Sequence, residues 1–356
     1  MDKNGNPPEK LVTNYGEHIK NADGFAQVFP EHKFLIVETY RQLGYKCGMT
    51  GDGVNDAPAL KRADVGIAVA GATDAAKAAA DIVLTQEGLS TIVLGLEVSR
   101  SIFARMKSFL TYRIAATLQL LTFFFIAVFA FIPSEYARNA PDASIWPGFF
   151  SLPVIFLIIL TVINDGTLIS IGYDHAVPSR YPERWVLPAL FIVSIALGAV
   201  ACGSSLLLLY ICLTSWEPTG LLQLLGIGGL PYGEIVNIMF LKVAVTDILT
   251  LFSSRTSHQF FFQRKPHYIL LICTGVALCI STALSLAWPC GTLDEIHVCG
   301  LGYHKKMVAV YIWVYCLVVF LIQDLVKVIT WRILIRFNLF NINHQVNKSQ
   351  IYSRAQ

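Results

Sequence analysis

The stretch G-M-T-G-D-G-V-N-D-A-P-A-L-K-R-A-D, from Gly48 to Asp64, places acidic and amide side chains among glycines and ahead of a proline. Gly51 and Gly53 allow backbone angles that residues with a side chain avoid. Asn55 or Asp56 can cap a helix that has a proline in its first turn. A tight turn followed by a helix start therefore explains most of the stretch.

A turn alone does not explain Asp52. This residue follows a predicted strand at Lys46–Thr50, and ligands of open α/β sheets bind at the carboxyl ends of the strands. A carboxylate at that edge, with Asp56 one turn later, suits Mg²⁺, which takes one or two carboxylates and keeps several waters. The stretch therefore predicts part of a magnesium-dependent site.

Short strands and helices alternate on both sides of this stretch. Such alternation at short spacing predicts a parallel α/β sheet. A longer helix is expected to begin near Leu89 and to continue through Arg105. The other predicted strands are Phe25–Phe29, Val65–Ala70 and Asp81–Thr85, and the other helices begin at Pro30 or span Pro58–Ala63 and Ala72–Ala80.

The rest of the chain has the composition of a membrane protein. Of the 356 residues 54% are hydrophobic and only 14% are charged. Apolar runs of about 20 residues are long enough to cross a bilayer as helices. The sequence predicts a soluble domain at 1–107, an all-α membrane domain at 108–337 and a short polar tail at 338–356. The predicted membrane helices lie near 109–132, 148–172, 187–213, 234–254, 267–288 and 308–335.

Charges and cysteines give the expected topology. The polar start of the chain lacks the apolar core of a signal peptide, so the first domain and both termini are expected in the cytosol. Cys290 and Cys299 flank a polar loop, and whether they form a disulfide stays open. A net charge of +3 without a basic patch gives no reason to expect a nucleic-acid partner. Lys and Arg gather on the predicted cytosolic side, at Arg100, Arg105, Lys107, Arg180, Arg184, Arg255, Arg264, Lys265, Arg332 and Arg336, with Lys305 and Lys306 as exceptions.

Asn164 and Asp165 lie inside the apolar run of the second membrane segment. An acid at that depth is costly and is a functional candidate, with a structural anchor between helices as the alternative. The first segment has no acid, whereas calcium needs six to eight oxygen ligands. A single desolvated carboxylate can load and release a proton, so a proton is favoured, with sodium and potassium left open.

Two further pairs of charges lie in predicted membrane helices. Lys242 and Asp247 are too far apart to share a helix face, so each is expected to pair with a neighbouring helix. Either a structural role or a supporting role in a proton path is compatible with that position. Asp324 and Lys327 can pair with each other, or Lys327 can extend toward the cytosol.

The run T-G-D-G-V-N-D-A-P at Thr50–Pro58 resembles the hinge signature of P-type cation-pumping ATPases, and the preceding P-E-H-K ends in Lys33, which resembles the family's phosphate-contacting lysine. This resemblance implies a dehalogenase-like, Rossmannoid fold for 1–107, the C-terminal part of a phosphorylation domain plus a stalk helix. It implies ATP as the substrate. It also implies Mg²⁺ on Asp52 and Asp56, with phosphate contacts from Lys33, Thr50, Gly51 and Asn55.

Three membrane-domain motifs, R-M-K-S-F-L-T-Y-R-I-A, I-N-D-G-T and I-G-Y-D-H-A-V-P-S, resemble the plasma-membrane proton pumps of plants, fungi and protozoa. The resemblance implies that Asp165, with Asn164 beside it, carries the transported proton across the plasma membrane. Plant members pair this aspartate with an arginine on the preceding helix. The best-matching position here is Gln119, which can form hydrogen bonds but supplies no charge.

The family's phosphorylated aspartate, in D-K-T-G-T, does not occur in these residues, and M-D-K-N-G at Met1–Gly5 lacks both threonines. The T-G-E loop, the nucleotide-binding domain and the first four membrane helices are also missing. Two hypotheses follow: the C-terminal part of a proton-exporting ATPase, or a truncated, catalytically inactive membrane protein. A pump for another cation stays an alternative, and the oligomeric state is not predicted.

Overall fold

The computed structural model describes residues 11–141, 143–178, 185–224, 226–302 and 306–341. The chain divides into two compact units, one up to Val98 and one from Ser99. The expectations for Met1–Gly5, Arg180, Arg184 and Lys305, and for the tail beyond residue 341, lie outside the described residues. The functional division into 1–107, 108–337 and 338–356 stays a prediction.

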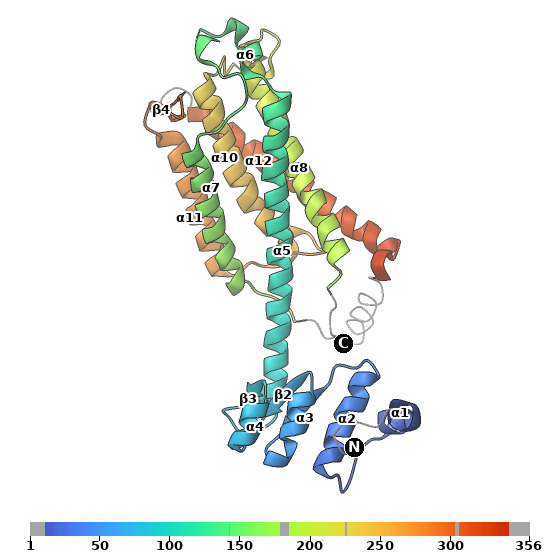
Figure 1. Cartoon of the computed structure of the whole chain (residues 1–356). Helices are drawn as coiled ribbons and strands as arrows, with labels where there is room; N and C mark the ends of the chain where they lie inside the picture. The colour runs from blue at the N-terminus through green and yellow to red at the C-terminus, as the bar shows by residue number, and fades with distance from the viewer. Residues whose placement is uncertain (1–10, 142, 179–184, 225, 303–305, 342–356) are drawn as a thin grey trace. The chain divides into compact units, whose positions relative to one another are not determined.

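The first unit is built on a three-stranded parallel sheet in the order β1-β2-β3. Figure 1 shows this small sheet with its helices in blue. Parallel strands need crossover connections, and short helices supply them here. This confirms the predicted α/β fold. The elements are α1 (Leu11–Asn21), α2 (Pro30–Gln42), β1 (Gly48–Gly51), the 3₁₀ turn η1 (Val54–Asp56), α3 (Ala57–Arg62), β2 (Val65–Ala68), α4 (Asp74–Ala79) and β3 (Ile82–Val83).

The predicted start of α2 is confirmed and the strand predicted before it is wrong. Pro30 occupies the first turn of α2, where the missing N–H of proline costs nothing. The residues Phe25–Phe29 form no strand. Gln27 adopts a left-handed conformation with φ of 54°, which interrupts an extended run.

Close backbone packing joins β2 to α3. A Cβ added to Gly66 would lie 2.5 Å from the carbonyl oxygen of Leu60, so this approach requires glycine. Leu60 and Ala68 are fully buried and form a small core with Ala76 of α4. This packing fixes the connection that follows β1, where the predicted site residues lie.

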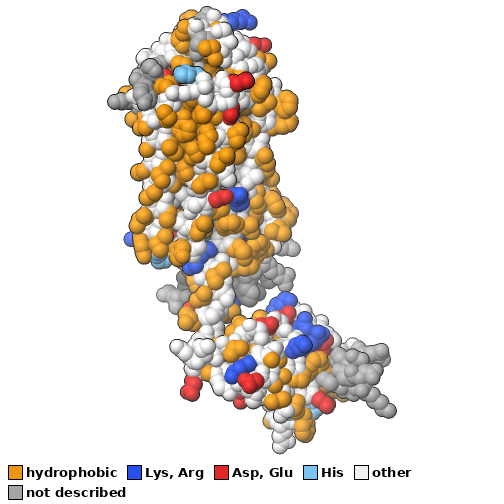
Figure 2. Space-filling model, turned by 60° about the vertical axis from the view of Figure 1, so that its left-hand side comes forward, with side chains coloured by type: hydrophobic (Ala, Val, Ile, Leu, Met, Phe, Trp, Pro, Cys, Tyr) orange, Lys and Arg blue, Asp and Glu red, His pale blue; other side chains and the backbone are white. Residues whose placement is uncertain are grey.

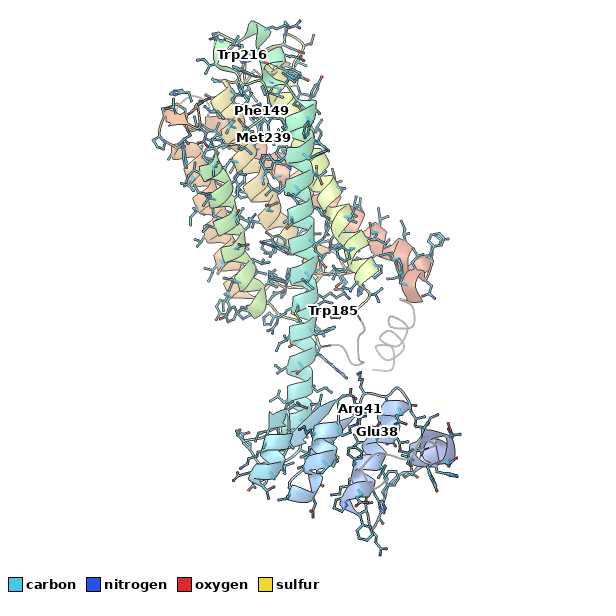
Figure 3. All side chains as sticks on the ribbon, viewed as in Figure 1. Glu38, Arg41, Phe149, Trp185, Trp216 and Met239 are labelled. Carbon is cyan, nitrogen blue, oxygen red and sulfur yellow. A yellow bond between two sulfur atoms is a disulfide. The ribbon has the colours of Figure 1, made fainter. Side chains whose placement is uncertain are left out.

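An ion pair joins α2 to α3. Nη2 of Arg62 donates to Oε1 of Glu38 over 2.8 Å, and its Nε contacts the other carboxylate oxygen. The hydrogen bond from Arg62 lowers the pKa of Glu38, against the effect of burial. Figure 3 labels Glu38 and Arg41 on α2. Arg41 also donates to the carbonyl of Arg62, so α2 is held firmly beside α3.

Six helices among the described residues are long and apolar enough to cross a membrane, and the first of them begins in the first unit while the others lie in the second unit. The first of them, α5, is a single helix of 41 residues, which confirms the predicted continuous helix from near Leu89. The apolar exterior of this unit is visible in Figure 2. The helices are α5 (Ser90–Ala130), α7 (Val154–Ile169), α8 (Leu187–Leu213), α10 (Tyr232–Ser254), α11 (Tyr268–Ala287) and α12 (Lys306–Arg336), with the 3₁₀ turn η4 (Ser170–Tyr173) extending α7.

Helix α10 is the most enclosed of these helices, with 94% of its apolar window buried inside the unit. It packs against α7, α8, α11 and α12 (Figure 1). Trp185 and Trp216 lie at opposite ends of the unit in Figure 3, as expected for aromatic side chains at membrane interfaces. The charges that α10 carries are therefore surrounded by other helices.

A disulfide closes a short hairpin between α11 and α12. Cys290 and Cys299 are bonded across the antiparallel strands β4 (Gly291–Leu293) and β5 (Ile296–Val298). Asp294 at the turn accepts a 2.8 Å hydrogen bond from the backbone N–H of Val154, at the start of α7. The open question about these cysteines is thus resolved in favour of a disulfide.

Candidate functional site

Lys33 and Asp56 form the centre of the predicted phosphoryl site. The ammonium of Lys33, on α2, donates to Oδ1 of Asp56, in η1, over 2.6 Å. The other oxygen of Asp56 accepts from the backbone N–H groups of Asp52 and Gly53, at 3.4 and 3.5 Å. The turn after β1 therefore brings together residues far apart in sequence.

The Asp56 side chain is only 6% exposed. Burial raises the pKa of this carboxyl, but the Lys33 hydrogen bond and the two backbone N–H groups outweigh it, so the pKa lies below its ordinary value. A Cβ added to Gly51 would lie 2.6 Å from Cβ of Asp56, so Gly51 is needed for this close approach. The buried carboxylate is therefore ionised and rigidly held.

Asp52 directly follows β1, with Thr50 and Gly51 as the last residues of the strand. Its side chain is exposed, and its backbone carbonyl accepts from the N–H of Thr73 over 2.9 Å. Asn55 is also exposed, in η1. The exposed side chains thus lie at the carboxyl end of a parallel strand, where α/β sheets bind ligands.

These residues fit a magnesium ion that takes few protein ligands. Asp52 offers a solvent-accessible carboxylate, whereas both oxygens of Asp56 already accept hydrogen bonds from the protein. No group of three or more His, Cys, Asp or Glu side chains with metal-binding spacing occurs in the part of the chain that the structure describes. Mg²⁺ suits such a site because it retains waters and binds phosphate oxygens.

In the second unit, Asp165 of α7 forms an ion pair with Arg113 of α5. The two side chains are 49% and 47% exposed. The cation beside Asp165 is therefore Arg113, on the preceding membrane helix, whereas the resemblance pointed to the position of Gln119 on that helix.

Asn164 and Gln119 lie beside a different acid. Nδ2 of Asn164 donates to Oδ2 of Asp247, on α10, over 2.7 Å. The buried amide of Gln119, on α5, lies near the same carboxylate, although its Nε2 makes no hydrogen bond within the described residues. Of the three residues predicted for ion transport, two thus surround Asp247 and one pairs with Arg113.

The other buried charges of this unit have structural partners. Lys242 donates to the carbonyl of Ala201 over 2.9 Å and to the hydroxyl of Ser205, both on α8. Lys327 pairs with Asp324 over 2.7 Å, which confirms the local pairing among the alternatives. Lys242 therefore joins α10 to α8 by hydrogen bonds, which agrees with the structural role that the sequence left as one of two alternatives.

Arg255 and Asp174 form a cluster that the sequence did not predict. The guanidinium of Arg255, at the end of α10, donates twice to Asp174, each time over 2.9 Å. The Asp174 carboxylate also accepts from the backbone N–H of His267 over 3.1 Å. The end of α7 is thereby fixed to the connection between α10 and α11. The sequence signal was an Asp in I-G-Y-D-H and an Arg just after an apolar run.

The chain is similar to known proteins in both units. Residues 37–91 match the family model of haloacid dehalogenase-like hydrolases, which confirms the predicted dehalogenase-like fold. Two proteins of Leishmania donovani named "Probable proton ATPase", 1A and 1B, are each 50% identical to it over 330 residues. These matches cover 90% of this chain and 34% of each relative.

A more distant relative is a "Putative cation-transporting ATPase" of the archaeon Methanocaldococcus jannaschii. It is 34% identical over 315 residues, which cover 88% of this chain and 34% of the relative. The chain thus spans about a third of the length of the relatives it matches. The similarity extends through the turn after β1 and through most of the helical unit.

Proposed function

Since this chain belongs to the P-type cation-transporting ATPases, we propose that it supplies the membrane path and one half of the phosphoryl-transfer site of a proton-exporting pump. The observation that carries the proposal is the ion pair between Arg113 and Asp165 in helices that follow the Thr50–Pro58 signature. The 50% identity to relatives named as proton ATPases supports the same ion.

In the phosphoryl site, we propose that Lys33 offsets negative charge on a phosphorylated aspartate and that Asn55 orients the phosphoryl oxygens. Thr50 and Gly51 would contribute contacts at the end of β1. Mg²⁺ would be held mainly by Asp52, with Asp56 as the supporting ligand, and would polarise the phosphoryl oxygens when bound. The rigid Lys33–Asp56 pair supports this division, because it fixes the lysine without occupying Asp52. Catalysis by these residues is electrostatic.

We propose that the aspartate that receives the phosphoryl group lies outside these 356 residues, since they contain no D-K-T-G-T. We therefore expect the chain by itself not to hydrolyse ATP. Its activity can be tested in a chimera in which it replaces the matching third of the Leishmania relative. The chimera should form an acid-stable phosphoenzyme from labelled ATP. Labelling of the isolated chain would contradict the proposed site.

The Lys33→Met chimera tests the role of the lysine, and Lys77→Met is its control. Lys77 forms a longer, exposed ion pair within α4, with Asp74 at 3.7 Å, whereas Lys33 pairs with the buried Asp56. Loss of one charged contact to the phosphoryl group should reduce turnover by roughly 10²–10³-fold. Equal activity of the two variants would sink the assignment of Lys33.

In the membrane, we propose that Asp165 lies on the proton path and that the pair with Arg113 faces further helices of the pump. Half-exposed charges at this depth are unfavourable against hydrocarbon. The pump would export protons across the plasma membrane, with both termini of this chain in the cytosol. The proposed partners are thus the lipid bilayer and the transported proton.

A pump for another cation is the second candidate. Vesicles containing the chimera can be tested with a pH-sensitive dye and, separately, with labelled calcium and rubidium. The proposal expects ATP-dependent acidification without uptake of either label. ATP hydrolysis that moves a metal cation but no protons would assign the chain to that second class.

A further inference from the structure

We propose that Asp247, on α10, is a second proton-binding residue in the membrane unit, holding its proton on Oδ1. The inference adds a residue to the proposed proton path, and its role in transport rests on the proposed function. Asp165 has a cation in direct contact, whereas Asp247 has none among the described residues. The two acids therefore differ in the charge that lies next to them.

The surroundings of Asp247 disfavour a negative charge. Its residue surface is only 3% exposed, and its Oδ2 accepts a single 2.7 Å hydrogen bond from Asn164. Its Oδ1 has no hydrogen-bond partner in the described part of the chain. An isolated carboxylate is costly in such surroundings, and taking up a proton removes that cost.

Within the described residues, four buried polar atoms of α5, α7 and α10 have no hydrogen-bond partner. They are the Tyr112 hydroxyl and Gln119 Nε2 on α5, Asn164 Oδ1 on α7, and Asp247 Oδ1 itself. Tyr112 and Gln119 are each 1% exposed, and both lie near Asp247. Buried polar groups are nearly always paired. The set of unpaired atoms around Asp247 therefore indicates a place where a transferable proton binds. A protonated Oδ1 becomes a donor, and an amide oxygen or a hydroxyl group, such as those of Asn164 and Tyr112, can accept from it.

None of the described contacts of the charged groups on α10 and on the helices packed against it conflicts with a proton on Asp247. On α10 itself, Lys242 lies five residues away and directs its ammonium at Ala201 and Ser205 on α8. Helices α8 and α11 contain no Asp, Glu, Lys or Arg. The titratable groups of these two helices are Cys202, Tyr210, Cys212, Tyr268, Cys273 and Cys279.

On α7 the charged residue is Asp165, already paired with Arg113. On α12, Asp324 and Lys327 pair with each other and bond to Ser253 and Thr256, further along the chain than Asp247. Cys316 of α12 accepts from Thr246 over 3.7 Å. None of these described contacts places a cation on the Asp247 carboxylate.

Infrared spectroscopy of the full chain in lipid nanodiscs tests the inference without any need for transport. A protonated carboxyl absorbs apart from a carboxylate. We expect its band at neutral pH in the wild type and in Asp165→Asn, and its loss in Asp247→Asn. A band that persists in Asp247→Asn, or that disappears in Asp165→Asn, would overturn the proposal.

The variant Asn164→Leu gives an independent readout if Asp247→Asn does not fold. It removes the hydrogen bond to Oδ2 and leaves the Arg113–Asp165 pair untouched. The carbonyl band of Asp247 should then shift to higher frequency, and an unchanged band would contradict the assignment. Because these readouts use the chain alone, their failure is distinguishable from a failure of the chimera to pump.

Discussion

Removal of Arg255 should strongly destabilise the membrane unit, because it leaves the buried Asp174 carboxylate with only the more distant cation of Arg264, at 4.0 Å. The side chains of Arg255 and Asp174 are 2% and 4% exposed, and two 2.9 Å hydrogen bonds join them. Arg255 also donates to the backbone carbonyls of Arg264 and Lys265, at 2.7 and 3.0 Å. Breaking a buried pair from one side costs about 3–5 kcal/mol.

The variant Arg255→Met should therefore lose about 3–5 kcal/mol of unfolding free energy. Because the Asp174 charge causes most of this loss, the double variant with Asp174→Asn should be more stable than the sum of its parts by roughly 1–3 kcal/mol. Titration with a denaturing detergent, followed by tryptophan fluorescence, measures these differences. The control Arg264→Met removes a cation 4.0 Å from Asp174 that is 24% exposed, and should cost less than about 1 kcal/mol.

Strictly additive losses in the double variant would refute this reasoning, because they would show that the buried charge is not the cause. A loss in Arg264→Met as large as that in Arg255→Met would do the same. In either case the cluster would stabilise the unit through packing, and the direct ion pair between Arg255 and Asp174 would contribute little to the unfolding free energy.

Three other predictions concern the first unit and the hairpin. Gly66→Ala should destabilise the sheet by about 1–3 kcal/mol, whereas Gly48→Ala, whose Cβ would meet its nearest neighbour at 3.9 Å, should change little in the same unfolding assay. The folded-state pKa of Asp56 is depressed, so ionised Asp56 stabilises the fold above the ordinary pKa of aspartate, and this stabilisation is lost as the pH falls through the depressed value. The variant Lys33→Met should move the loss of stability to higher pH. An unchanged pH profile of stability would refute the role of Lys33. Reduction of the hairpin disulfide should allow labelling of its cysteines by an impermeant reagent from the external face of vesicles only, and labelling from the cytosolic face would contradict the topology.

The sequence predicted the structure best at positions where a residue type favours one local conformation. Pro30 predicted the start of α2, and the glycines around Asp52 predicted a strand followed by a tight turn. The long apolar runs predicted the membrane helices, because a bilayer requires that length. These features depend on local geometry, so they can be predicted without knowledge of the tertiary contacts.

Contacts between distant elements could not be predicted in this way. Phe25–Phe29 has strand-like residues, but the left-handed Gln27 interrupts it. The pairing of Arg113 with Asp165 could not be predicted because the two residues lie on different helices, and the family resemblance pointed to Gln119 instead. Nothing in the local sequence of Asn164 indicates that its amide binds Asp247 instead of its neighbour Asp165. Partner choice between membrane helices depends on their packing, which no local pattern specifies.

The most direct test of the account is ATP-driven acidification of vesicles by the chimera, compared with its Asp165→Asn variant. The account predicts acidification with the aspartate present. It predicts none with asparagine, which keeps the size of the side chain but cannot take up a proton at neutral pH. Phosphoenzyme formation should be retained in the variant, since Asp165 lies in the membrane unit and Lys33, Asp52 and Asn55 in the other. Acidification that survives Asp165→Asn would contradict the claim that Asp165 lies on the proton path.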